Sequence, residues 1–172
     1  MKSNRSKWWM LAYIAIPVLY LAAQFLPYFH SGSTVFPSLW ALFWYPERNE
    51  EAINFIALYY HGFRINEFVT ALLITQIAAI FLIITALIKK NSGIVAVLLG
   101  CWGVFGLISF FTTRALTFSV IAIYSGIAGI LMLSLFVAAV ATSAVYLTRM
   151  YLDYRALVAL YNQEQAERSV QT

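Results

Sequence analysis

Four long apolar runs, joined mostly by short polar segments, constrain the fold of this chain more than any other feature of its sequence. They cover about residues 8–28, 68–88, 93–111 and 118–147. A helix needs about 20 apolar residues to cross a hydrocarbon core of about 30 Å, and each run approaches or exceeds that length. Because lipid offers no hydrogen-bond partners, such a segment must satisfy its own backbone groups, as a helix does. We therefore expect an all-α polytopic membrane protein with four transmembrane helices in a bundle.

The low charge of the chain agrees with this fold class. Charged residues make up only 10% of the 172 residues, whereas they reach about 25% in soluble domains. One membrane domain accounts for the whole chain. Cys101 is the only cysteine, so the chain has no second thiol for an intramolecular disulfide. Its apolar neighbours predict a buried thiol that packs inside the bundle.

Basic residues predict the orientation in the membrane. With the amino terminus inside, the inner side carries Lys2, Arg5, Lys7, Lys89, Lys90, Arg149, Arg155 and Arg168. The outer side carries only Arg48, Arg64 and Arg114. Cytoplasmic segments are enriched in Lys and Arg, so we expect a plasma-membrane protein with both termini in the cytoplasm. The expected partner of its basic face is the lipid bilayer, and we expect no nucleic acid.

Residues 29–66 form the one long connection between spans, and in this orientation they face the exterior. The first half is rich in aromatic rings, which prefer the headgroup level of a membrane. The second half has a helix pattern between Asn49, a good N-cap, and Gly62, a good C-cap. We interpret the loop as an interfacial helical cap over the bundle. Its candidate interaction surface consists of Phe36, Trp40, Phe43, Trp44 and Tyr45.

In outline, one long and one short outer loop between inner termini is similar to the layout of claudin-like four-span proteins. Those proteins carry a cysteine pair in the first outer loop, and this loop contains no cysteine. No function is carried over from that layout.

Small residues predict close contact between the third and fourth spans. Helices in a bilayer associate through close packing and polar contacts, because lipid tails are as apolar as leucine. The residues that we assign to this packing are Gly100, Gly103, Gly106, Ser125 and Gly129. Contact within one chain is the favoured interpretation, and contact with a second subunit is the alternative.

Gln76 lies near the middle of the second span. No Asp, Glu, Lys, Arg or His lies in the middle of any span, although proton relays and ion-coupled carriers usually place ionisable groups there. An amide at this depth should seek an interhelical hydrogen bond, so we expect Gln76 to be an intramembrane polar link. The alternative is a residue that lines a pore or binds a substrate.

Beyond the fourth span, apolar residues continue to recur at three- and four-residue steps. This period predicts that the fourth helix continues into the cytoplasm as a helical tail, residues 148–172. Its apolar stripe predicts contact with a membrane surface, a second copy or a different protein. The alternative is that the stripe folds against the inner loop and the termini. The stripe consists of Met150, Tyr151, Tyr154, Leu157, Val158 and Tyr161.

The chain contains no H-E-x-x-H, G-x-S-x-G or P-loop sequence, and we expect no cofactor and no metal site. The two candidate surfaces favour a non-enzymatic membrane subunit or accessory protein that contacts partners. A homo-oligomeric channel or a membrane subunit of a transporter is the first alternative. The second is a membrane enzyme that acts on lipid through polar residues of the outer loop: His30, His61, Glu47, Glu50, Glu51 and Glu67.

Overall fold

The computed structural model describes residues 2–26, 30–31, 34–35, 65–88, 92–112 and 127–170. These described residues form four helices: α1 (Lys2–Ala23), α4 (Ile65–Ile88), α5 (Ser92–Thr112) and α7 (Ile127–Val170). The two-residue strands β1 (His30–Ser31) and β2 (Thr34–Val35) pair antiparallel, with His30 opposite Val35. Apart from this short pair, the elements of the described residues are all helical.

Three of the helices are long and apolar enough to cross a membrane. They are α4 over Thr70–Ile88, α5 over Gly93–Thr112, and α7, whose candidate segment is Ile127–Glu167. α1 has a shorter apolar helical stretch, Trp8–Ala23. The expected spans 68–88 and 93–111 fall within α4 and α5, while the first part of the expected fourth span, 118–126, lies outside the described residues.

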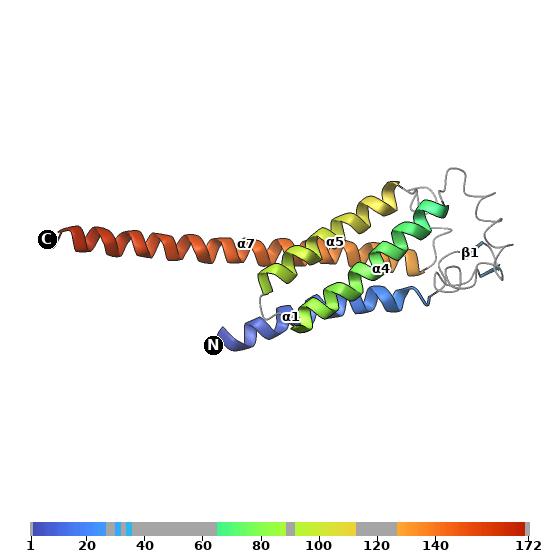
Figure 1. The fold of residues 1–172 in the computed structure, drawn as a ribbon, viewed down its shortest axis with the longest axis horizontal. Coiled ribbons are helices and arrows are strands. Elements are labelled where there is room, and N and C mark those ends of the chain that lie inside the picture. Colours follow the sequence, from blue (N-terminus) through green and yellow to red (C-terminus); the bar gives the residue numbers. More distant parts are fainter. Residues whose placement is uncertain are drawn as a thin grey trace.

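The described helices pack against one another, and we call this packed part of the described residues the bundle; one helix projects from it. α1 contacts α4, α5 and α7, and α5 lies between α4 and α7, with its most extensive interface against α7. Figure 1 shows α7 leaving the bundle at the end where α1 begins, and continuing well beyond the other helices. The amino terminus, the end of α4 and the start of α5 lie at that same end of the bundle (Figure 1).

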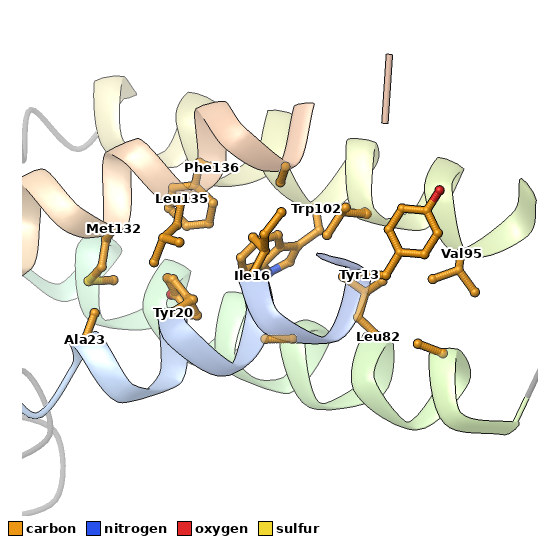
Figure 2. Packing of buried hydrophobic residues seen from close by; sticks show 14 of the residues in the cluster. Tyr13, Ile16, Tyr20, Ala23, Leu82, Val95, Trp102, Met132, Leu135 and Phe136 are labelled. Atoms are coloured by element: carbon orange, nitrogen blue, oxygen red, sulfur yellow. The ribbon is translucent and has the colours of Figure 1, made fainter. Parts of the chain in front are cut away.

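Aromatic rings from three helices meet in the core. The ring of Phe136 on α7 lies 4.9 Å from Trp102 and 5.6 Å from Phe110, both on α5, and 5.1 Å from Tyr20 on α1, measured between centroids. All four side chains are buried. Figure 2 shows Tyr20, Trp102 and Phe136 between the helices, with Met132 and Ala23 nearby. Tilted and edge-on ring contacts of this kind add to the stabilisation that burial provides.

α7 is one continuous helix of 44 residues, about 66 Å long at a rise of 1.5 Å per residue. We call residues 148–170 the extension. Every side chain from Thr148 to Glu167 is exposed. The expected continuation of the fourth helix beyond the apolar span is therefore present, and the alternative that its stripe folds back against the inner loop and termini is wrong for these residues.

Cys101 lies on the outward face of α5, where it is exposed. The expectation of a buried thiol is therefore wrong. Gly103 and Trp102 are buried, but each step along a helix turns the side chain by about 100°. Apolar neighbours in the sequence thus did not identify the face on which this thiol lies.

Candidate interaction sites

A group of buried polar side chains joins α1, α4 and α5. The Thr75 hydroxyl donates its proton to the carbonyl oxygens of Leu72 (2.8 Å) and Ala71 (3.0 Å). The same hydroxyl oxygen accepts a hydrogen bond from the Tyr20 hydroxyl at 2.5 Å. A threonine hydroxyl carries a single proton, so Tyr20 is the donor of that interhelical bond. From α5, the indole nitrogen Nε1 of Trp102 donates to the Thr75 carbonyl oxygen at 3.0 Å. One turn of α4 is thereby bonded to both neighbouring helices.

Gln76, next to Thr75, makes a second link to α1. Its Nε2 donates a hydrogen bond to Oε1 of Gln24, which lies in the turn that follows α1. Both amides are buried. The Nε2 of Gln24 has no hydrogen-bond partner within the described part of the chain. In a low-dielectric interior this arrangement holds the end of α1 against the middle of α4.

Three glycines on α5 face α7. A Cβ atom at Gly103 would lie 2.9 Å from the carbonyl oxygen of Phe136 and 3.1 Å from the Cβ of Ala139, and one at Gly106 would overlap the Phe136 ring. Gly100 lies against Ser143, whose hydroxyl donates to the Ala96 carbonyl oxygen at 2.6 Å. The two backbones approach this closely only because the glycines have no side chain.

A groove separates α1 from the start of the extension. Trp9, Tyr13 and Tyr146 form an aromatic cluster with centroid distances of 5.5 Å between Trp9 and Tyr146 and 5.9 Å between Tyr13 and Tyr146. The guanidinium carbon of Arg149 lies 5.8 Å from the centroid of the Trp9 ring, within the range of a cation–π contact. The groove beside this contact encloses about 540 Å³. We call it the Trp–Arg groove, and it is lined by Trp8, Trp9, Arg149, Leu152 and Asp153.

The exposed stripe of the extension repeats the buried face of α7. Phe136 and Tyr154 are separated by 18 residues, which is five full turns of 3.6 residues, so they lie on the same side of the helix. Ala139 and Leu157 are related in the same way. Within the bundle these positions are buried, and in the extension they are exposed. The pairs in which a buried position corresponds to a residue of the stripe are Met132 and Met150, Phe136 and Tyr154, Ala139 and Leu157, and Ser143 and Tyr161, while the buried Leu135 corresponds to the exposed Asp153.

The structure brings together several residues that the sequence singled out and leaves others undescribed. Gly100, Gly103 and Gly106 lie at the interface of α5 with α7, Gly129 is buried on α7, and Gln76 is bonded to Gln24. Ser125 lies outside the described residues. So does the proposed outer surface of Phe36, Trp40, Phe43, Trp44 and Tyr45.

The sequence alone does not show which residues are the partners of Gln76 and Thr75, nor that α1 and α7 form a groove. Gln24 and Tyr20 could have been proposed as these partners, because polar side chains in one apolar span are natural hydrogen-bond partners of polar side chains in the next span. The sequence indicates the groove less clearly, because the groove forms only when Trp8 and Trp9 of α1 lie beside Arg149 of α7. In the described ranges, no group of three His, Cys, Asp or Glu residues gathers that could hold a metal ion.

No family model, no curated protein and no solved structure matches this chain. Its function is therefore inferred from its own residues.

Proposed function

We propose that this chain is a non-enzymatic subunit or accessory protein of the plasma membrane, which spans the bilayer four times and contacts a protein partner through the stripe of the extension. The observation that carries the proposal is the row of large apolar side chains exposed on a helix that leaves the bundle. Tyr154, Leu157 and Tyr161 are each exposed by 60% or more. Contiguous apolar patches of this kind typically mark sites of interaction.

α1 serves as the fourth span. Its apolar helical stretch, Trp8–Ala23, is followed by a tighter turn in which Phe25 N donates to Ala22 O and Leu26 N donates to Ala23 O, each at 3.1 Å. With a rise of 1.5 Å per residue in the α-helix and 2.0 Å per residue in the tighter turn, the distance from Trp8 to Leu26 is about 28 Å. That length is close to the thickness of a hydrocarbon core, about 30 Å.

The end of the bundle from which the extension projects is the cytoplasmic end. α1 begins at that end, and its first residues include Lys2, Arg5 and Lys7, while Lys89 and Lys90 directly follow α4 in the sequence. The enrichment of Lys and Arg in cytoplasmic segments supports this assignment. The partner of the extension is therefore a cytoplasmic protein, or a cytoplasmic part of one.

The rotational position of the stripe favours a different protein over a second copy. The stripe lies on the side of α7 that is covered by α1 and α5 within the bundle. A second copy in the same membrane that approached from this side would meet those helices before its own extension reached Leu157. A partner that approaches from the cytoplasm meets no such obstacle beneath the ends of α1 and α5.

Photo-crosslinking in cells tests this proposal. A photoreactive amino acid would replace Tyr154 or Leu157 on the stripe, and Ala156 or Gln163 on the opposite side of the helix serve as matched control positions. All four positions are exposed. We expect the stripe positions to form an adduct with one polypeptide of different mass, and the control positions to form little of it.

A charge on the stripe provides the second arm of the test. Leu157→Glu should abolish the adduct formed from Tyr154, whereas Gln163→Glu should leave it unchanged. Equal adducts from both sides of the helix, or none from the stripe, would refute the proposal. An adduct of two copies of this chain would instead show that the partner is a second copy.

A further inference from the structure

The Trp–Arg groove lies where the apolar parts of two helices end. Trp8 begins the apolar stretch of α1, and Arg149 is the first charged residue after the apolar part of α7. Tryptophan rings and arginine side chains at such positions anchor helices at the headgroup level. With the four-span placement proposed above, on which this inference rests, the groove opens at the depth of the headgroups of the inner leaflet.

Two opposite charges face the groove at a fixed spacing. Arg149 and Asp153 both line it, and they lie one helical turn apart on α7, which is a rise of about 6 Å. A guanidinium binds phosphate through charge-assisted hydrogen bonds, and a carboxylate accepts hydrogen bonds from an ammonium group. The ring of Trp8 is 73% exposed and offers a second surface for a cation. The groove thus presents complementary groups for a ligand that carries a phosphate and an ammonium a short distance apart.

The surface below the groove is suited to acyl chains. Leu11 on α1 and Val145 on α7 are exposed, and each lies about one turn deeper in the membrane than the groove residue on its helix, Trp8 or Arg149. Apolar side chains at this depth face lipid. A soluble phosphate ester would use the groove alone, whereas a phospholipid would use the groove and this surface.

We propose that the Trp–Arg groove binds the headgroup of a zwitterionic aminophospholipid of the phosphatidylethanolamine type. Arg149 holds the phosphate, Asp153 accepts a hydrogen bond from the ammonium, and the acyl chains lie along the exposed faces of α1 and α7. The negative charge of Asp153 selects against headgroups that lack the ammonium, such as phosphatidylglycerol.

Native mass spectrometry of the purified full-length protein tests the groove. Phosphatidylethanolamine and phosphatidylglycerol with the same acyl chains would be offered in turn, and the retained lipid would be counted. Arg149→Gln should weaken retention of phosphatidylethanolamine by about tenfold, because one charged hydrogen-bond partner of the phosphate is lost. Asp153→Asn should remove the preference between the two headgroups. Arg155→Gln is the matched control, since Arg155 also lies near an aromatic ring, Tyr151, at 5.8 Å, but does not line the groove.

The outcomes separate this inference from its alternatives. Retention with no headgroup preference, or an equal loss in Arg149→Gln and Arg155→Gln, would overturn it. Full competition by soluble phosphoethanolamine at the same concentration as the lipid would show that the ligand is a free phosphate ester. Arg149→Lys, which keeps the charge, would retain more lipid than Arg149→Gln if both variants elute as the folded protein. Crosslinking at Tyr154 does not involve the groove, so its failure would refute the proposed partner without deciding the lipid site.

Discussion

The two halves of α7 present the same face of one helix to different surroundings. Between Ile127 and Leu147 that face is buried against α1 and α5, and in the extension it is exposed. The side chains differ in size at two of the four equivalent positions, where Ala139 and Ser143 in the bundle correspond to Leu157 and Tyr161 in the extension. Periodicity therefore defines which side of α7 carries both the buried residues of the bundle and the stripe of the extension. In the bundle, side-chain size reflects how closely α5 approaches α7.

Close approach in the bundle depends on both helices. Ala139 lies opposite Gly103, and Ser143 lies opposite Gly100, so small residues on α7 meet residues with no side chain on α5. Among the described residues, nothing comparable restricts Leu157 or Tyr161, which are both exposed. The partner that we propose for the extension would therefore have to accommodate large side chains.

The largest effect on the free energy of unfolding should come when a position in the bundle half of α7 receives the residue found at the equivalent position of the extension. Ala139→Leu places three further carbon atoms in a fully buried site beside Gly103, where no space is available. Overpacking of this kind costs up to about 3 kcal/mol, so we expect the free energy of unfolding in mixed micelles to fall by about that amount. Ala141→Leu adds the same atoms on the exposed side of α7 and should change it little. Equal effects of the two variants would contradict the buried face assigned to α7.

A smaller loss should follow from a single methyl group on α5. Gly106→Ala forces a Cβ atom against the ring of Phe136, which is itself enclosed by Tyr20 and Trp102. We expect a loss of about 2 kcal/mol in the same unfolding measurement. Because Phe136→Leu frees space at that point, the double variant should be more stable than the sum of the two single effects predicts. Strict additivity would show that the two residues do not touch.

The sequence predicted the helices better than their partners. Runs of apolar residues give the length and ends of α4 and α5 directly, and the small residues of the third and fourth spans predicted that α5 packs closely against α7. Hydrogen bonds depend on rotation and depth, so the link from Gln76 to Gln24 became evident only once α1 and α4 were placed. The same limit explains the wrong expectation for Cys101, because an apolar run leaves the outward face undefined.

Removing the Gln24–Gln76 link should produce an effect of intermediate size. Interhelical hydrogen bonds in membranes contribute about 0.6–2 kcal/mol, and Gln76→Leu also leaves the buried Oε1 of Gln24 without its donor. We expect a loss of about 1 kcal/mol for Gln76→Leu. The double variant with Gln24→Leu should recover part of it, since no buried amide then remains unpaired.

Thr85→Val is the control for this link, because Thr85 on the same helix donates only to the Phe81 carbonyl oxygen within α4. Its effect on the free energy of unfolding should be smaller than that of Gln76→Leu. If the two are the same, the amide pair contributes nothing beyond an ordinary polar residue in the span.

The smallest effect on the free energy of unfolding should come from the reverse exchange, in which positions in the extension receive the residues found at the equivalent positions of the bundle half of α7. Leu157→Ala with Tyr161→Ser removes two large side chains that are exposed in the described part of the chain, so the free energy of unfolding should change by less than about 0.5 kcal/mol. The same double variant should lose the crosslinked adduct at Tyr154, because the stripe then lacks two of the large side chains that the proposed partner would contact. An unfolding change as large as that of Ala139→Leu would mean that the extension packs against the bundle in the membrane. Unchanged crosslinking together with unchanged stability would mean that Leu157 and Tyr161 contribute neither to the bundle nor to the contact with a partner.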